Sequence, residues 1–149
     1  MKTALFRITI TGMLTLALMA ATETARAQEP LLVNIPFAFT AARVALPAGE
    51  YRVQKAAYQS SALLIQRTDQ GAASMVMSFA AEAKAQKAES KLVFRRYGNR
   101  YFLSEIWIAG SARGRELPKS PQEKEQALAA HNEMPETVTI VARLIVPKP

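Results

Sequence analysis

Side chains able to perform acid–base, nucleophilic or metal chemistry are few in this chain. The 149 residues include no cysteine and a single histidine, His131, which excludes thiolate metal sites, cysteine nucleophiles and pairs of imidazole ligands. A carboxylate pair of the kind that hydrolyses glycosides could be assembled from Glu50, Glu105 and Glu116. The sequence has no glycine-rich phosphate loop and no calcium loop. We therefore expect a protein that is not an enzyme and that needs no cofactor or metal.

Glu105 is the carboxylate whose surroundings most need an explanation. It lies between Leu103 and Trp107 in an apolar run, and the alternation of a strand turns all three side chains to one face. A carboxylate on a buried face needs a cation or several hydrogen-bond donors, and the expected partner is Arg113 or Arg115 in the following loop. We predict a buried ion pair at Glu105. The alternative hypothesis is that Glu105 is the acid of a hydrolase acting on envelope glycans.

A second group of residues combines positive charge with aromatic rings on either side of one turn. Its members are Arg95, Arg96, Tyr97, Arg100 and Tyr101. Such interleaving is typical of proteins that bind single-stranded nucleic acids. The N-terminal residues, however, predict export of the chain, which favours an anionic envelope polysaccharide as the partner. We predict this group as the candidate ligand-binding site. The alternatives are a merely solubilising hairpin tip and a small apolar ligand held inside the fold.

The first 27 residues have the order of a secretory signal peptide. Two basic residues precede the uncharged, mostly apolar stretch Ile8–Ala21, and Ala25-Arg26-Ala27 supplies a small-x-small cleavage site. The apolar stretch is shorter than the ~20 residues that cross a bilayer. We predict cleavage after Ala27, a periplasmic or extracellular location, and no stable membrane insertion of residues 28–149. Cleavage lowers the formal net charge from +7 to +5, because the removed segment holds three basic residues and one acidic residue.

Residues 28–149 have the pattern of one all-β domain. Short runs rich in β-branched and aromatic residues are separated by turn residues. The runs are Leu32–Phe39, Glu50–Gln54, Ala62–Arg67, Ser74–Phe79, Lys91–Tyr97, Arg100–Ile108 and Thr137–Val146. We predict a single antiparallel sandwich or small barrel of about seven strands. Pro36 should place the first strand at an edge or at a bulge, and Gly110 and Gly114 should bracket a loop.

One short helix is predicted in the second half of the domain. Ser120 is a suitable N-cap, Pro121 suits the first helical position, and Glu123 can reach back to the cap amide. The helix should run to about His131, whose imidazole would then interact with the helix C-terminus. The segment Ala80–Ala88 contains good helix formers but no apolar stripe, so a solvated loop is expected there.

The turn at Gly98-Asn99 fixes an expected register for the flanking strands. A two-residue loop with glycine first favours a type II′ turn, which pairs Tyr97 with Arg100. The more apolar face, expected to point into the core with Trp107 as its largest anchor, then carries Leu92, Phe94, Arg96, Tyr101, Leu103, Glu105 and Trp107. The opposite face carries Val93, Arg95, Tyr97, Arg100, Phe102, Ser104 and Ile106.

Several motifs together resemble a family of small, uncharacterised secreted proteins of soil bacteria. They are Val33-Asn34-Ile35-Pro36-Phe37-Ala38-Phe39, Leu46-Pro47-Ala48-Gly49-Glu50-Tyr51-Arg52-Val53, the hairpin run from Leu92 to Trp107, and Gly114-Arg115-Glu116-Leu117-Pro118-Lys119-Ser120. The resemblance extends to about Glu125. It implies a secreted, β-rich single domain and brings no activity, so the biochemical role is expected to be that of a non-enzymatic binding or structural protein of the envelope.

Overall fold

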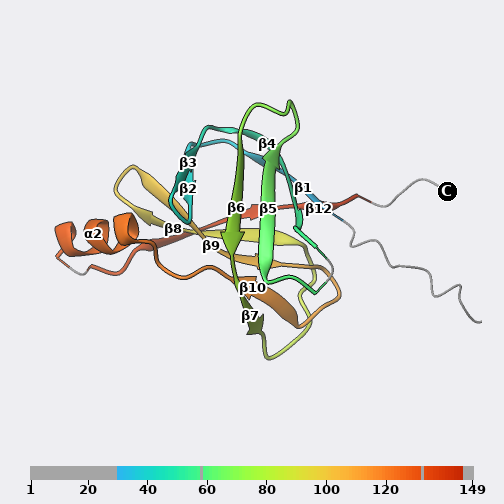
Figure 1. Ribbon diagram of the computed structural model, residues 1–149. Coiled ribbons are helices and arrows are strands. Elements are labelled where there is room, and N and C mark those ends of the chain that lie inside the picture. The colour runs from blue at the N-terminus through green and yellow to red at the C-terminus, as the bar shows by residue number, and fades with distance from the viewer. Residues whose placement is uncertain (1–29, 58, 132, 146–149) are drawn as a thin grey trace, which may run out of the picture.

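The computed structural model describes residues 30–57, 59–131 and 133–145 (Figure 1). The predicted signal peptide, residues 1–27, therefore lies outside the described residues. Within the described ranges, no helix has the length and apolar character needed to cross a membrane.

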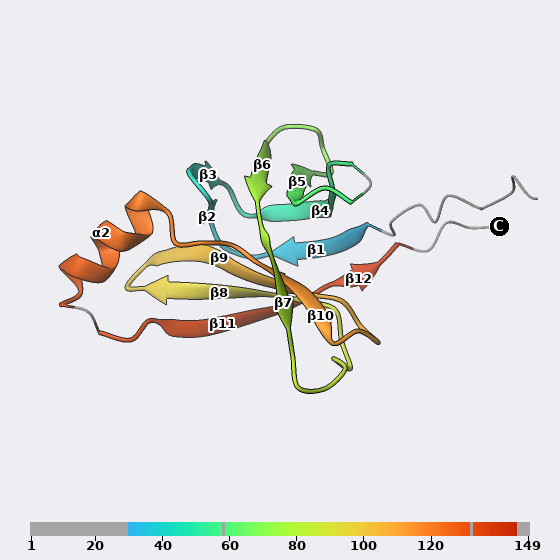
Figure 2. The same cartoon turned by 60° about the horizontal axis from the view of Figure 1, so that its bottom comes forward.

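The described chain forms two sheets and one helix (Figures 1 and 2). The first sheet has the antiparallel order β12-β1-β4-β5-β6. Its strands are β1 (Leu31–Ile35), β4 (Gly49–Lys55), β5 (Ala62–Arg67), β6 (Ala73–Met77) and β12 (Arg143–Leu144). Alternate residues of β1, β4, β5 and β6 are buried, as expected for strands that cover a core on one face only.

The second sheet follows the order β11-β8-β9-β10-β7, and the short strand β2 adds to β9 in parallel. Its strands are β2 (Phe39–Ala41), β3 (Val44–Leu46), β7 (Phe79–Glu82), β8 (Lys91–Tyr97), β9 (Arg100–Trp107), β10 (Arg113–Glu116) and β11 (Glu136–Val141). β8 and β9 are joined by the predicted hairpin. Gly98 has φ 59° and Asn99 is not among the residues with positive φ, as a type II′ turn requires.

Two nearly continuous strands pass from one sheet to the other. β6 leads into β7 through Ser78, and β11 leads into β12 through Ala142 (Figure 2). The first corner is held by Arg115, whose Nε donates to Ser78 Oγ at 2.9 Å and whose Nη2 donates to the carbonyls of Ser78 and Ser61. At the second corner, the Ala142 amide donates to the Ser90 carbonyl at 2.8 Å. The two sheets thus form a sandwich, and these two nearly continuous strands connect one sheet to the other.

The apolar core lies between the two sheets and draws on both. Its buried members include Val33, Ile35, Tyr51, Ile65 and Val76 from the first sheet and Leu92, Phe94, Leu103, Ile106 and Leu117 from the second sheet and its flank. Phe39 packs edge-on against Tyr51 and Phe94, which joins the aromatic side chains of both layers.

The prediction of an all-β sandwich with one short helix is confirmed. Within the described residues, the strand order of each sheet has two ends, so the sheets do not close into a barrel. β1 is an inner strand that ends at Ile35, so the expectation that Pro36 marks an edge or a bulge is wrong: the chain leaves the first sheet there and re-forms as β2 in the second.

Three further boundaries differ from the prediction. β7 occupies the beginning of the segment Ala80–Ala88, because its backbone pairs with β10 despite its polar sequence. Gly114 is a buried residue of β10 and not part of a loop. The last predicted run is divided at Ala142 into β11 and β12, and its end at Val146 lies outside the described residues.

The helix α2 (Pro121–Ala129) begins where the sequence predicts. The Glu123 amide donates to Ser120 Oγ at 3.1 Å, which completes the N-cap. The helix ends two residues before His131, which adopts φ 54° while its amide donates to the Leu128 carbonyl. His131 therefore lies in the turn that terminates the helix.

Candidate functional site

A β-bulge at Ser104 decides which side chains of β9 face outward. From the turn, the register pairs Arg96 with Tyr101 and Phe94 with Leu103, but Val93 is opposite Glu105. Ser104 is the extra residue; it is buried, and its Oγ donates to the Val93 carbonyl at 3.1 Å. One extra residue exchanges the faces of every side chain that follows it on the bulged strand.

The predicted inward face is correct up to the bulge and wrong beyond it. Leu92, Phe94 and Leu103 are core residues. Past Ser104, however, Ile106 points into the core in place of Glu105 and Trp107. Glu105 and Trp107 are directly opposite Val93 and Lys91, and they share the outer face of the second sheet with them.

Trp107 is buried on this outer face by two neighbouring segments. Its six-membered ring lies against Gly114 of β10, where an added Cβ would come within 2.5 Å of the ring atom Cε3. Lys87 covers the ring with its Nζ 4.7 Å from the ring centroid. Backbone hydrogen bonds of Lys87 to Ser111 and Gly110 fix the loop that carries this lysine. Trp107 is consequently 6% exposed, although it is not a core residue.

Glu105 is half-buried and accepts a hydrogen bond from Trp107 Nε1 at 2.7 Å. Within the described residues, no Lys or Arg nitrogen lies within 4.0 Å of its carboxylate. The predicted buried ion pair is therefore wrong, because the bulge turns Glu105 away from the core. Arg115 is held instead at the Ser78 corner, and Arg113 is exposed.

Among the residues that the structure describes, the buried ion pair joins Arg95 to Glu123. Arg95 Nε and Nη2 donate to the two carboxylate oxygens of Glu123, the second at 3.2 Å, and Tyr97 Oη donates to Glu123 Oε1 at 3.2 Å. The Glu123 side chain is 2% exposed. Glu123 thus does not reach back to the helix cap as predicted; it fastens α2 to β8.

Tyr97 titrates above its ordinary range because of this environment. Burial raises the pKa of the phenol above its ordinary value of 10.0, and the nearby Glu123 carboxylate raises it further, while Arg95 partly opposes the shift. The three side chains form one hydrogen-bonded network centred on the Glu123 carboxylate. Such a network fixes the position of Arg95 beside the open part of the sheet.

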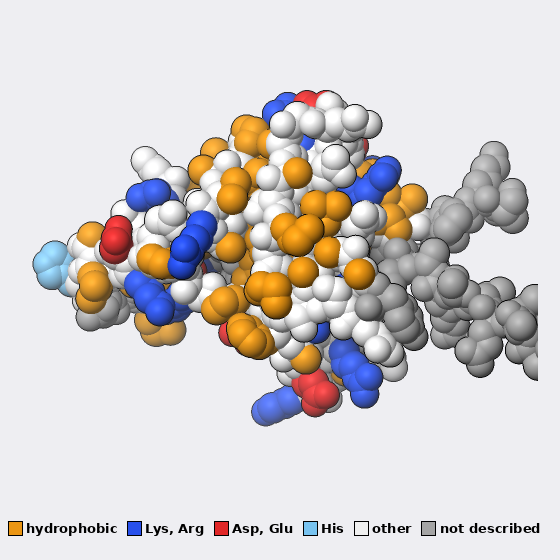
Figure 3. Space-filling model, in the orientation of Figure 1, with side chains coloured by type: hydrophobic (Ala, Val, Ile, Leu, Met, Phe, Trp, Pro, Cys, Tyr) orange, Lys and Arg blue, Asp and Glu red, His pale blue; other side chains and the backbone are white. Residues whose placement is uncertain are grey.

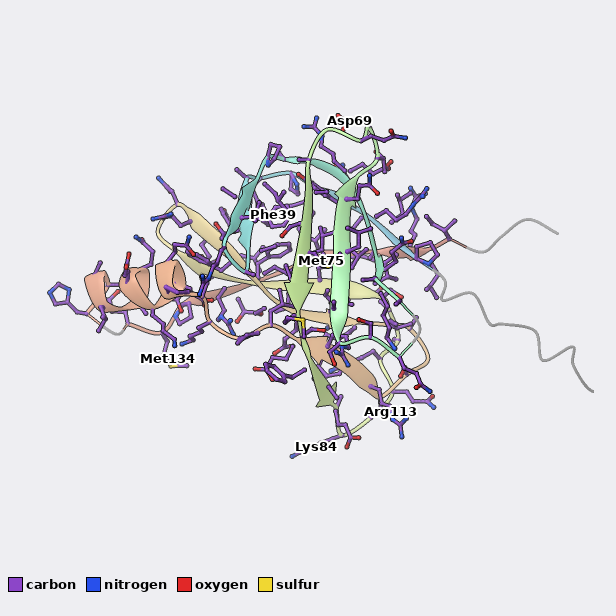
Figure 4. All side chains as sticks on the ribbon, viewed as in Figure 1. Phe39, Asp69, Met75, Lys84, Arg113 and Met134 are labelled. Carbon is purple, nitrogen blue, oxygen red and sulfur yellow. The ribbon has the colours of Figure 1, made fainter. Side chains whose placement is uncertain are left out.

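A groove of about 410 Å³ lies on this outer face. Its lining residues come from β8, β9, β11 and the segments next to them, and they are Lys87, Lys91, Val93, Arg95, Ser104, Glu105, Trp107, Met134, Pro135, Thr137 and Thr139. Thr137 is opposite Arg95 and Thr139 is opposite Val93. Figure 4 labels Met134, which lies at the end of the groove near α2.

The positive charge that the groove offers to a ligand comes mainly from two lysines. Arg95 is neutralised by Glu123, whereas neither Lys87 nor Lys91 takes part in a salt bridge among the described residues. Glu105 is the one carboxylate in the lining. The groove therefore combines two lysines, two threonine hydroxyls and an indole ring, a set that suits a hydroxyl-rich ligand with negative groups.

The predicted ligand-binding group at the hairpin tip is divided between two faces of the sheet. Arg95 and Tyr97 face α2 and Glu123. Arg96 and Tyr101 face the opposite way: Tyr101 stacks on Phe37 with ring centroids 3.8 Å apart, and Arg96 donates to Glu136. Arg100 is exposed on the α2 side near the Phe102 ring. Only Arg95 of the five residues lines the groove.

Sequence reasoning missed the lysines of the groove and the ion pair at Glu123. The signal for Lys91 was its place on the same strand face as Arg95, four residues away. Lys87 had no such signal, because it lies in a loop whose path depends on β7 and β10. Comparison of the chain with protein-family models, with curated proteins and with solved structures finds no match in any of the three.

Proposed function

We propose that the protein is an exported, non-enzymatic binding protein of the cell envelope that holds an anionic polysaccharide in the groove on the outer face of β8, β9 and β11. The observation that carries the proposal is the placement of Lys87 and Lys91 around Trp107, without a salt-bridge partner among the described residues. A uronic acid or phosphate-bearing glycan supplies both the negative groups and the hydroxyls that this lining can bind.

The electrostatics favour a polymer over a single anionic group. Lys91 and Thr137, which lines the groove opposite Arg95, lie four residues apart along the sheet, a separation of about 14 Å at the usual rise per residue. Exposed charge pairs are each worth ~0.2–1 kcal/mol, so useful affinity requires several contacts along an extended chain. Binding through such contacts weakens as the salt concentration rises.

The N-terminal sequence supports export of the protein, and export supports a ligand of the cell envelope. The basic start, apolar stretch and Ala25-Arg26-Ala27 site support export, and the resemblance to secreted proteins of soil bacteria points the same way. An exported protein meets anionic envelope glycans far more often than nucleic acids. These arguments support a periplasmic or extracellular protein with a polysaccharide partner.

Glu105 provides the observation that favours a second candidate, a hydrolase of envelope glycans. Its carboxylate lines the groove and accepts a hydrogen bond from the Trp107 indole. Most glycosidases use two carboxylates, whereas Glu105 is the only carboxylate among the described residues that line the groove. A Glu105→Gln variant distinguishes the two candidates: the hydrolase predicts product release by the wild type that the variant abolishes, whereas the binding protein predicts no product from either.

A binding titration with matched variants tests the proposed groove. Polygalacturonate is titrated into the wild type, into a Lys87→Ala/Lys91→Ala variant and into an Arg96→Ala/Arg100→Ala control, which loses the same charge at the hairpin tip. We expect the lysine variant to bind about tenfold more weakly, the control to bind like the wild type, and high salt to weaken all three. Equal weakening of both variants, or binding that ignores salt, would reject the groove.

A further inference from the structure

An apolar stripe runs along β6 at the edge of the first sheet and continues to the first residue of β7. Met75, Met77 and Phe79 alternate along β6 and β7 and are 66%, 62% and 62% exposed. Residues 72–81 contain no charged side chain. Figure 3 shows hydrophobic side chains gathered over this part of the molecule, and Figure 4 labels Met75 at its centre. Isolated exposed apolar residues are ordinary, but a continuous stripe on an edge strand is the pattern of an interaction site.

The backbone of β6 is also open on one side. β6 is the last strand of its sheet and pairs only with β5 among the described strands. The Arg67 amide donates to the Ala72 carbonyl and the Ser78 amide donates to the Ser61 carbonyl, so even-numbered residues of this segment face β5. The amide and carbonyl groups of Ala73, Met75 and Met77 consequently point away from the sheet, where another strand could pair with them.

We propose that β6 pairs with β6 of a second copy of this chain, antiparallel and about a two-fold axis at Met75. In this register Met75 is opposite its own counterpart and Ala73 is opposite Met77 of the other copy. All three outward-facing residues then form hydrogen-bonded pairs, each exchanging two hydrogen bonds. A shift of the axis to a neighbouring residue leaves one of the three without a partner within β6, so the central register is favoured.

Charge and area select a second copy as the occupant and limit the strength of the dimer. The formal net charge is +7, or +5 after the predicted cleavage, so two copies repel, and this repulsion is weakest where they meet at an uncharged segment such as residues 72–81. Three large side chains and a five-residue strand from each copy bury on the order of 1,000 Å² in total, the lower limit for a specific interface. The dimer is therefore weak and depends on concentration. It is independent of the proposed glycan groove, whose lining contains no residue of β6 or β7.

Cysteine cross-linking tests the register, because the natural chain contains no cysteine. Opposite residues of a hydrogen-bonded pair have Cα atoms about 5.5 Å apart, within disulfide range. Under mild oxidation of protein recovered from cells expressing the full chain, Met75→Cys should become mostly disulfide-linked dimer. Met77→Cys alone should not, since its counterpart lies about 14 Å away along the strand. A mixture of Met77→Cys and Ala73→Cys should cross-link again. Equal cross-linking of both single variants would overturn the two-fold register.

Sedimentation equilibrium tests the association itself. The wild type should show a reversible monomer–dimer equilibrium, and Met75→Lys should shift it at least tenfold toward monomer. Leu128→Lys, which introduces the same charge at an equally exposed site (67%) on α2, should associate like the wild type. A monomeric wild type at every concentration would overturn the proposal. So would binding to neutral phosphatidylcholine vesicles by a protein that stays monomeric, because the stripe would then be a lipid contact.

Discussion

The outer faces of the two sheets have opposite character although both are built from alternating strands. On β6, every second residue is exposed and apolar, and the alternation continues without interruption to Phe79. On β8 and β9, the outer face holds lysines, threonines, a carboxylate and a tryptophan around a groove. The carboxylate and the tryptophan of the second sheet owe their outward position to one residue, because the bulge at Ser104 moves Glu105 and Trp107 to the outside.

The two outer faces depend on different structural features. The stripe on β6 requires only a regular strand, so its side chains follow directly from the sequence pattern. The groove requires a bulge, a buried ion pair and a loop from a distant segment acting together. Changes to the second sheet should therefore cost far more stability than changes to the stripe.

Insertion of one serine after Ser104 should have the largest effect. If the bulge still absorbs a single residue, the added residue takes the place opposite Val93, which would turn Glu105 and Trp107 toward the core and Ile106 outward. We expect urea unfolding followed by circular dichroism to lose its cooperative transition. Ser104→Ala is the matched control and should cost only about 1 kcal/mol, because it removes a single buried hydrogen bond. An insertion variant that unfolds like the wild type would contradict this register.

Loss of the Glu123 carboxylate should have the next largest effect. Glu123→Ala leaves Arg95 without its partner beside a buried phenol, and breaking such a pair costs about 3–5 kcal/mol. Glu125→Ala removes an exposed carboxylate from the same helix and should change the free energy of unfolding by less than about 0.5 kcal/mol. Equal effects in denaturant titrations would show that the ion pair does not anchor α2.

Gly114→Ala tests the contact beneath Trp107 and should cost about 1–3 kcal/mol. The added methyl group would come within 2.5 Å of the tryptophan ring and 2.7 Å of the Ile106 carbonyl. Thermal unfolding of the same substitution in a Trp107→Leu background should show a smaller loss, since the shorter side chain leaves room. If the loss of stability is the same in both backgrounds, the Trp107 indole does not lie against Gly114.

The smallest expected effect is a dependence of stability on alkaline pH. The pKa values of Tyr51 and Tyr97 are both raised in the fold, chiefly by burial. Above pH 10 the unfolded chain loses these protons while the folded chain retains them, so the free energy of unfolding falls as the pH rises. Tyr97→Phe should make this fall less steep in urea titrations on either side of pH 10. If the free energy of unfolding falls with pH as steeply in the variant as in the wild type, the pKa of Tyr97 is not raised in the folded protein.

The all-β class, the hairpin turn and the start of α2 could be predicted because each depends on local chemistry. Gly98 at the turn and Ser120-Pro121 at the helix start act within a few residues. The passages from one sheet to the other at Pro36 and Ser78 could not be predicted, since a strand pattern does not reveal which sheet it joins.

The candidate site was predicted less well because its geometry depends on long-range packing. A bulge adds one residue without changing the apolar pattern, so Glu105 and Trp107 appeared to share the face of Leu103. Glu123 looked like an ordinary capping residue, and its partner Arg95 lies 28 residues earlier in the chain.

Trp107 emission provides the most direct test of the groove, because it is the only tryptophan in the chain and lines the groove. Titration with polygalacturonate at low salt should produce a saturable change in emission, which the Lys87→Ala/Lys91→Ala variant largely loses and the Arg96→Ala/Arg100→Ala control keeps. Binding detected by calorimetry with no change in Trp107 emission would contradict the account and place the ligand elsewhere on the protein.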